Sequence, residues 1–197
     1  VGCRIPSNKL ANKLITLLDM PIAAPSANLS ERTSVTNIID IDPILEKKIF
    51  VLKDKQSTLG LESTVVKIDN KNRIEVLRYG SITVEDLNKF AKVKIKKKSS
   101  ISPGNLKKHY STLKPIRMNA KKILKDEGLL NFGNNKLKSN IINLNLSNKK
   151  NLNEAAENFY HFLHKLDQSK CKKIAVAEIP DKGLGKTIND RLKRAIK

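Results

Sequence analysis

Apolar residues recur at helical spacing near the start of the chain and in short strand-like runs after it. Leu10, Leu14, Leu17 and Leu18 lie at helical spacing and predict a helix over residues 8–18, with Ser7 as its N-cap. A further helical turn is expected at 36–41, and Thr83 is expected to cap a helix that ends at Phe90. Short apolar runs predict strands at 22–24, 49–52, 63–68 and 74–77. The last two of these strands should form a hairpin.

The second half of the chain alternates strand-like and helix-like segments. Apolar runs predict strands at 116–118, 141–144 and 174–177. Helices are expected over Asn153–Leu166 and Thr187–Ala195, and the apolar stripe of the first consists of Ala156, Phe159, Leu163 and Leu166. Gly183 and Gly185 lack the third glycine of a dinucleotide fingerprint, so they predict a tight turn before the last helix. This alternation favours an α/β unit with a parallel or mixed sheet.

Between the two halves, residues 92–115 lose apolar periodicity and are rich in Pro, Gly, Ser and Lys. The basic run Lys92–Lys98 fits a linker, an edge strand guarded by lysines, or an RNA contact. The Ser-Ser-Ile-Ser-Pro-Gly segment that follows favours the linker. We therefore expect a first domain over residues 1–91, a linker over 92–115, and a second domain over 116–197.

The charge balance of the chain is strongly basic. Its 197 residues include 39 Lys and Arg against 19 Asp and Glu, which gives a formal net charge of +20. Such a charge attracts polyanions, although the lysines are dispersed in the manner of solvated faces rather than gathered in a stripe. Aromatic residues make up only 4% of the chain, which weakens the case for a platform that stacks single-stranded nucleic acid.

Cysteine and histidine spacings give no metal site and no nucleophile with an adjacent base. Cys3 and Cys171 lie far apart and predict reduced thiols, for which the default location is the cytoplasm. His161 and His164 are three residues apart, but without a third ligand nearby they favour a structural role. No apolar run approaches the roughly 20 residues of a membrane helix, so we expect no membrane partner.

Four segments place small hydroxyl, amide or guanidinium side chains at the ends of apolar runs. They read Pro-Ile-Ala-Ala-Pro-Ser-Ala-Asn-Leu-Ser at 21–30, Leu-Gly-Leu-Glu-Ser-Thr-Val-Val at 59–66, Leu-Arg-Tyr-Gly-Ser-Ile-Thr at 77–83, and Ser-Pro-Gly-Asn-Leu-Lys-Lys-His-Tyr at 102–110. Ser26 and Asn28 can donate to phosphate oxygens or can close a local turn. Arg4 and Arg78 carry forks of donors that suit carboxylates and phosphates, or they are surface arginines of a basic protein.

In this order, with these lengths between them, the four segments resemble the YrdC-type L-threonylcarbamoyladenylate synthases in the long form with an extra C-terminal domain. The resemblance begins at Val1–Pro6, resumes at Ile179–Gly185 and extends to Asn189–Ala195. It implies a nucleotidyltransferase that converts L-threonine, bicarbonate and ATP to threonylcarbamoyl-AMP and pyrophosphate, with Mg²⁺ on the ATP phosphates. The product then feeds the tRNA-modification machinery that acts on adenosine 37.

The resemblance also implies roles for individual residues, with no catalytic nucleophile. The threonine site would consist of Arg4, Ala24 and Ser63, and Thr64, the neighbour of Ser63, would face away from it. Contacts to ATP would come from Ser26, Asn28, Ser34, Arg78 and Tyr110. Tyr110 would approach the nucleotide because the linker folds back as a lid. Glu31 adds a negative charge beside the expected phosphate site.

The N-terminal portion of the family, with its Pro-Thr-Asp-Thr-Tyr-Gly-like stretch and Lys-x-Arg pair, has no counterpart in this sequence. We therefore expect a fragment: an incomplete YrdC-like twisted mixed sheet with helices, followed by a small Rossmann-like α/β domain. A separately encoded N-terminal half would complete it by sheet pairing. The alternative function is a basic RNA-binding module or an inactive remnant.

Overall fold

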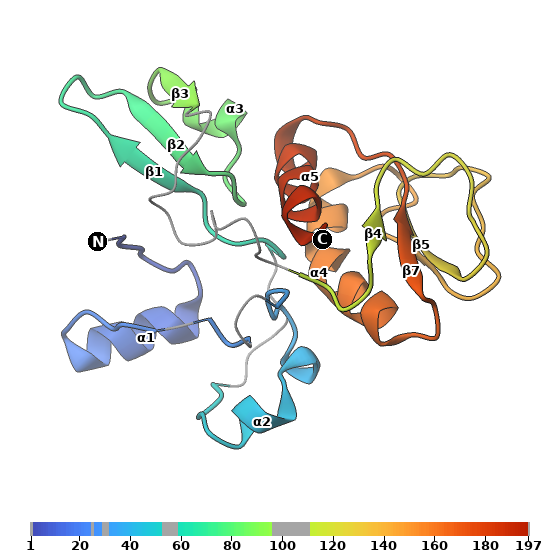
Figure 1. The fold of residues 1–197 in the computed structure, drawn as a ribbon. Helices are drawn as coiled ribbons and strands as arrows, with labels where there is room; N and C mark the ends of the chain where they lie inside the picture. Colours follow the sequence, from blue (N-terminus) through green and yellow to red (C-terminus); the bar gives the residue numbers. More distant parts are fainter. Residues whose placement is uncertain (1, 25, 29–31, 53–58, 96–110, 197) are drawn as a thin grey trace.

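The computed structural model describes residues 2–24, 26–28, 32–52, 59–95 and 111–196 (Figure 1). An N-terminal part, residues 2–95, contains a three-stranded sheet, and a C-terminal part, residues 111–196, contains a four-stranded sheet. This mixed α/β architecture agrees with the fold class expected from the sequence. Within the described ranges, every helix is too short or too polar to cross a membrane.

Helix α1, Lys9–Leu18, forms where the leucine spacing predicts it. Its N-cap is Asn8 and not Ser7, because the Asn8 side chain accepts a hydrogen bond from the Ala11 amide at 2.8 Å. No residue of α1 is buried, so its apolar stripe is not covered by the rest of the described chain.

Two strands predicted in the N-terminal part are wrong. Residues 22–24 and 49–52 have irregular backbone and are mostly exposed. Both runs have the composition of strands, but a strand needs a neighbour to complete its hydrogen bonds, and none of the described strands lies beside them. The helical turn expected at 36–41 is present as the 3-10 helix η1, Ile38–Asp40, and α2, Pro43–Glu46, follows it.

The predicted hairpin is present as β1, Val65–Ile68, and β2, Ile74–Arg78, which pair antiparallel. A third strand, β3, Val93–Ile95, adds to β2 in parallel and forms an edge of the sheet. It lies inside the segment expected to be a linker. The lysine run therefore begins as the edge strand that we weighed as an alternative, with Lys92 and Lys94 beside the apolar positions.

Helix α3, Val84–Leu87, connects β2 and β3 and is shorter than predicted, ending at Leu87 rather than Phe90. Thr83 caps it as expected, and Asp86 completes a capping box with Thr83. Hydrogen bonds from Lys89 and then Thr83 lower the pKa of Asp86 to about 2. The cap fixes the start of the helix directly after the segment that holds Arg78.

The C-terminal sheet consists of four parallel strands in the order β4-β7-β5-β6. Their bounds are Ile116–Arg117 for β4, Glu127–Asn131 for β5, Asn143–Asn145 for β6 and Lys173–Val176 for β7. Sequence periodicity missed β5, because only Leu129 and Leu130 of its five residues are large and apolar. The buried Glu127 is satisfied there, since Arg117 donates to both of its carboxylate oxygens, at 2.9 and 2.6 Å.

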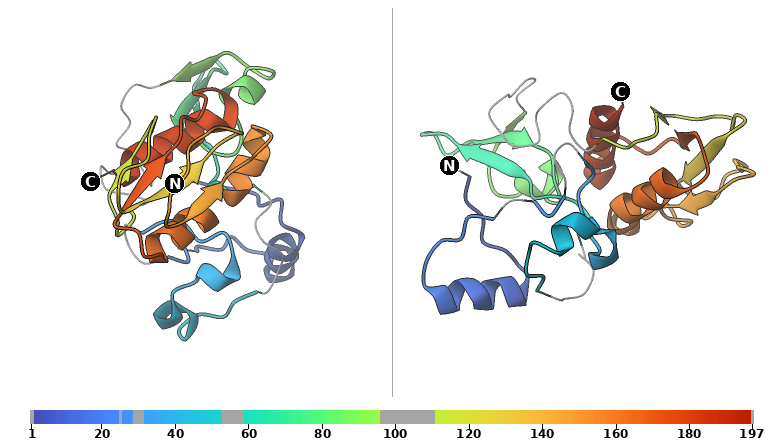
Figure 2. Two further views of the ribbon diagram at one scale, coloured as in Figure 1. Left: turned by 90° about the vertical axis from the view of Figure 1, so that its right-hand side faces the viewer. Right: turned by 60° about the horizontal axis from the view of Figure 1, so that its bottom comes forward.

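Two helices cover one face of this sheet, on the side toward the N-terminal part (Figures 1 and 2). The four stripe residues predicted for α4, Leu152–Gln168, are all buried. Helix α5, Gly183–Ala195, begins earlier than predicted, so Gly183 and Gly185 form its first turn rather than a turn before it. At Gly185 a Cβ would lie 2.1 Å from the Pro180 carbonyl oxygen, which explains the glycine.

Candidate functional site

Three of the predicted site residues meet at the start of β1. Arg4 Nη1 donates to Ser63 Oγ at 2.8 Å, and Arg78 Nη2 donates to the Ser63 carbonyl oxygen at 2.9 Å. Arg4 is exposed, whereas Ser63 and Arg78 are half-buried. Residues separated by 59 and 15 positions in sequence thus present two guanidinium groups and a hydroxyl at one place, which is the donor set that binds a carboxylate.

Thr64, the neighbour of Ser63, binds the protein backbone with its hydroxyl group. Its hydroxyl accepts a hydrogen bond from the Ile82 amide at 3.0 Å and donates one to the Ile82 carbonyl oxygen. These bonds connect the start of β1 to the segment before α3. The threonine hydroxyl therefore holds the backbone, and the role of Ser63 in a threonine site stays a prediction.

Glu62, directly before Ser63, joins both parts of the molecule. Its carboxylate accepts hydrogen bonds from Ser34 Oγ, from Tyr160 Oη at 2.7 Å and from Arg191 Nε at 2.9 Å. We call these four residues the Glu62 cluster. Burial raises the pKa of the Glu62 carboxyl, but the charge of Arg191 and the hydrogen bonds from Ser34, Tyr160 and Arg191 outweigh burial, and the pKa is lowered.

The contact with Glu62 bears on the predicted role of Ser34 in binding ATP. The structure places it beside the segment that carries Ser63, close to the predicted threonine residues. Its hydroxyl, however, donates its single proton to Glu62. Ser34 therefore binds a phosphate as a donor only if this hydrogen bond is exchanged.

Arg191 is fully buried, and its remaining donors are also used. Nη1 donates to Asp190 and Nη2 to the Tyr79 carbonyl oxygen, both at 2.6 Å. One helix turn earlier, Thr187 Oγ1 donates to the Gly80 carbonyl oxygen at 2.9 Å. Helix α5 thus binds the backbone directly after Arg78, while its contact to Glu62 binds the segment directly before Ser63.

The segment before Glu62 packs closely on α4. Gly60 has φ +60°, and a Cβ at this position would lie 2.0 Å from the Ala156 carbonyl oxygen. Leu61 is buried among the apolar side chains of the C-terminal part. The two site segments are therefore held by the two helices of the other part, and not only by their own sheet.

Sequence reasoning missed Glu62 and Arg191, which lie 129 residues apart. The one feature of the sequence that could have indicated a buried role for Arg191 is its position on the apolar stripe of α5. It lies between Ile188 and Leu192, both fully buried, where an arginine requires a buried acceptor. The sequence alone does not say which of the 19 acidic residues supplies it.

Within the described part of the chain, the structure does not connect the other predicted site residues to Ser63. Ala24 and Ser26 are exposed on irregular backbone, and the hydrogen bonds of the described residues do not connect them to Ser63. Asn28 Nδ2 donates to the Arg32 carbonyl oxygen at 3.2 Å, which is the local turn that we weighed as its alternative. Arg32 forms a β-bridge with Ser111. Tyr110 and Glu31 lie outside the described residues.

The two histidines on α4 contact the N-terminal part, as their structural interpretation predicts. His161 Nδ1 lies 3.0 Å from an Asp40 carboxylate oxygen, and His164 Nε2 lies 2.9 Å from the Thr33 hydroxyl. No group of three or more His, Cys, Asp or Glu residues within the described ranges could hold a metal ion. The candidate site consists of arginines, hydroxyls and backbone groups.

Two family models match this chain, and together they cover nearly all of it. One, described as "Telomere recombination", matches residues 1–80. The other, described as "Threonylcarbamoyl-AMP synthase, C-terminal domain", matches residues 82–196, more than half of the chain. The chain belongs to the threonylcarbamoyl-AMP synthase family. This confirms the resemblance seen in the four sequence segments.

Relatives in this family include the threonylcarbamoyl-AMP synthases of Pyrococcus abyssi and Bacillus subtilis. The first is 26% identical over 223 residues, and the second is 28% identical over 217 residues. Each alignment covers 99% of this chain, but only 63% and 62% of the respective relative. The Schizosaccharomyces pombe enzyme is 34% identical over 122 residues, which cover 55% of this chain and 30% of that enzyme.

Two solved structures of Pyrococcus abyssi Sua5 have the same fold. The structure complexed with L-threonine has a TM-score of 0.82 at 24% identity, and covers 98% of this chain and 62% of that one. The H234A/Y235A variant has a TM-score of 0.75 at 23% identity, over 98% of this chain and 60% of that one. The chain thus spans less than two thirds of the length of the Pyrococcus abyssi and Bacillus subtilis enzymes.

Proposed function

We propose that this chain forms part of an enzyme that makes threonylcarbamoyl-AMP and pyrophosphate from L-threonine, bicarbonate and ATP. The observation that carries the proposal is the convergence of Arg4 and Arg78 on Ser63. These residues come from three separate sequence segments that resemble the family. Membership of the family, whose named relatives are threonylcarbamoyl-AMP synthases, supports the same conclusion.

In the proposed mechanism, the residues act by position and charge. Arg4 pairs with the threonine carboxylate, and Ser63 Oγ donates to the same ligand once Arg4 turns toward it. Arg78 fixes the Ser63 backbone and contacts the nucleotide in this proposal. The threonine amine attacks the carbon of bicarbonate, a C–O bond of bicarbonate breaks and water leaves, which gives a carbamate. A carbamate oxygen then attacks the α-phosphorus of ATP, the bond from that phosphorus to the bridging oxygen breaks, and pyrophosphate leaves. Cationic donors stabilise the charge that develops there.

Mg²⁺ would enter this site with ATP. The described residues provide no carboxylate cluster for it, whereas phosphate oxygens and water are ligands that Mg²⁺ accepts readily. The chain itself would bind the charged groups of the two substrates. Nucleotide contacts from Ser26, Asn28, Ser34, Arg78 and Tyr110, and a backbone contact from Ala24, belong to this proposal.

The setting of the reaction is part of the same proposal. The enzyme would be cytoplasmic and would supply the tRNA-modification machinery, as a nucleotidyltransferase that forms no covalent bond to its substrates. A complementing N-terminal half would complete the catalytic sheet. Large apolar side chains of the N-terminal part, such as Leu17 at 74% exposed and Phe50 at 90% exposed, offer it surface to cover.

Calorimetric titration with L-threonine and a non-hydrolysable ATP analogue tests the proposal, with the chain alone and mixed with an N-terminal half from a relative. We expect binding in the mixture, with loss of threonine affinity in Arg4→Ala and Ser63→Ala. Arg73→Ala, on the distant hairpin turn, and the exposed Ser7→Ala should bind as wild type does. Absence of binding in the mixture would rule out the proposed activity for this chain.

A second candidate is an RNA-binding module, favoured by the net charge of +20. It predicts that tRNA binds in filter assays, that the affinity falls steeply with salt, and that ATP has no effect. If tRNA does not bind at any salt concentration, this candidate is excluded.

A further inference from the structure

The C-terminal part contains a hollow of about 860 Å³ that the proposed function does not use. Its walls are residues 120–123, 132, 134–138, 177–178 and 180, which follow β4, β5 and β7, together with Lys150. These three strands are neighbours in a parallel sheet. In open α/β sheets, ligands bind beyond the carboxyl ends of the strands, which is where this hollow lies. Its volume suits a small organic ligand.

The rim of the hollow carries five lysines and a single glutamate. The lysines are Lys121, Lys122, Lys136, Lys138 and Lys150, all of them exposed. Within the described part of the chain, none of their ammonium groups is paired with a carboxylate, and the one acidic residue in the wall is Glu178. Several unneutralised cations around one concave surface produce a positive potential that attracts anions.

The floor of the hollow is apolar. Ala120, Phe132 and Ala177 line it, and all three are otherwise buried. A ligand that fits has a compact body against these residues and its negative charges toward the rim. Phe132 is too deeply buried to stack on a base, so the hollow has no aromatic platform for a nucleic acid strand.

The walls are held in place before any ligand binds. Asn135 Nδ2 donates to Asn131 Oδ1 at 2.6 Å and to the Phe132 carbonyl oxygen, while Asn135 Oδ1 accepts from the Leu137 amide at 3.0 Å. The stem of Lys150 crosses Gly133, where a Cβ would lie 2.7 Å from Lys150 Cγ. The glycine therefore lets the stem of Lys150 lie close against this wall.

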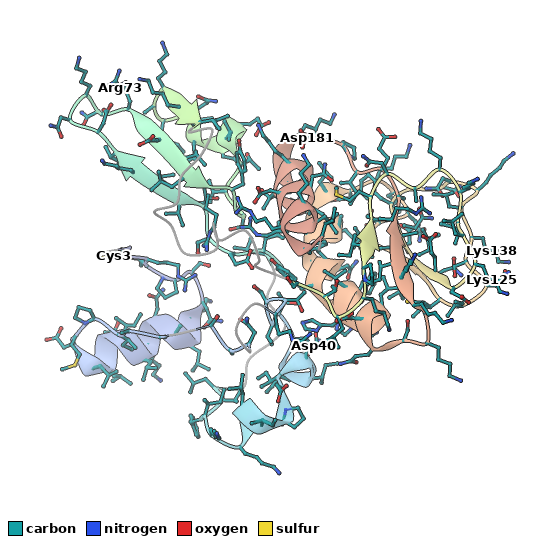
Figure 3. All side chains as sticks on the ribbon, in the orientation of Figure 1. Cys3, Asp40, Arg73, Lys125, Lys138 and Asp181 are labelled. Atoms are coloured by element: carbon teal, nitrogen blue, oxygen red, sulfur yellow. The ribbon has the colours of Figure 1, made fainter. Side chains whose placement is uncertain are left out.

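We propose that this hollow, the basic pocket, binds a small phosphate-bearing anion of the size of pyrophosphate or a nucleoside diphosphate. Phosphate is the chemistry that lysine ammonium groups recognise as point charges. The site is separate from the one around Ser63, because α4 and α5 lie between the N-terminal part and the sheet that carries it. Figure 3 shows Lys138 at the opposite end of the molecule from Cys3, the neighbour of Arg4.

The test uses calorimetric titration of the whole chain with sodium pyrophosphate and with ADP. The pocket variant is Lys136→Gln/Lys138→Gln/Lys150→Gln. The control variant, Lys125→Gln/Lys149→Gln/Lys170→Gln, removes the same charge from exposed lysines outside the pocket. We expect the pocket variant to bind at least about tenfold more weakly and the control variant to stay within about twofold of wild type. Because all six side chains are exposed, unfolding midpoints should be unchanged.

Three results would overturn the proposal. Wild type could bind neither probe, or both triple variants could lose affinity equally, which is attraction by net charge alone. A labelled RNA hairpin could also bind through the pocket lysines without being displaced by pyrophosphate, which would make the surface an RNA contact. The Arg4→Ala/Ser63→Ala variant should bind pyrophosphate as wild type does. A failure of the proposed synthase activity therefore leaves this measurement unaffected.

Discussion

Arg191 Nε donates to Glu62 Oε2 across 2.9 Å, and this contact connects the last helix to the segment that carries Ser63. The Arg191 side chain has no exposed surface, and the Glu62 side chain is 18% exposed. Removing one partner of such a pair leaves the other charge buried without compensation, which costs more than the pair itself contributes. The Glu62 cluster should therefore control how firmly the two parts are joined.

Replacing Arg191 tests this directly. Arg191→Met should lower the free energy of unfolding by about 3–5 kcal/mol, because it leaves the Glu62 carboxylate in a mostly buried place. Lys89→Met is the control: Lys89 pairs with Asp86 at the surface, where the two side chains are 69% and 46% exposed, and its loss should cost less than about 1 kcal/mol. Urea unfolding monitored by circular dichroism measures both. Equal losses would show that Arg191 contributes no more than a surface cation.

Acidification should weaken the same cluster. The pKa of Glu62 in the folded protein lies below its ordinary value of 4.5, so its stabilising effect is present above that value and is lost as the pH falls through the folded pKa. The difference in unfolding free energy between wild type and Glu62→Gln should therefore be largest near neutral pH and shrink below about pH 4.5. Urea titrations at several pH values check this. A difference independent of pH would contradict it.

Gly60 should tolerate no side chain. Gly60→Ala places a Cβ 2.0 Å from the Ala156 carbonyl oxygen and imposes φ +60° on an L-residue. We expect a loss of at least about 2 kcal/mol in stability, measured by thermal unfolding. Gly2→Ala, where nothing lies within 4 Å of the added Cβ, is the matched control and should unfold as wild type does. A wild-type midpoint for Gly60→Ala would mean that this segment does not pack on α4.

Thr187 contributes a second link between α5 and the N-terminal part. Thr187→Val removes the donor to the buried Gly80 carbonyl oxygen while keeping the side-chain shape, so stability should fall by about 1–3 kcal/mol. Hydrogen exchange should also rise for amides near Gly80. Thr16→Val, which loses a bond on the exposed face of α1, should leave global stability within about 0.5 kcal/mol of wild type.

Helix periodicity, capping residues and turn residues correctly predicted the elements that depend on neighbours in the sequence. The stripe of α4, the Thr83 cap and the β1–β2 hairpin each follow from residues close together in sequence, and each is present. Strands depend on distant neighbours. Residues 22–24 and 49–52 have strand composition without a partner, whereas β5 has a partner on each side and accepts a glutamate because Arg117 lies beside it.

The candidate site divides in the same way. Resemblance to the family identified Arg4, Ser63 and Arg78, and the structure brings them together. It did not identify Glu62 or Arg191. Each is a single charged residue in its own segment, and nothing in the sequence indicates that these two distant residues form a pair. The place of Ser34 follows from this pair, since its hydroxyl donates to the same carboxylate.

Cys3 is exposed next to Arg4, whereas Cys171 is 2% exposed within the C-terminal core. A thiol-reactive dye added to the native protein should therefore attach at a single position, one residue from the guanidinium that contacts Ser63. Cys3 of the wild-type chain thus provides an attachment point for a fluorescent dye that reports on the proposed threonine site. The Cys3→Ser variant, which should remain unlabelled, is the control.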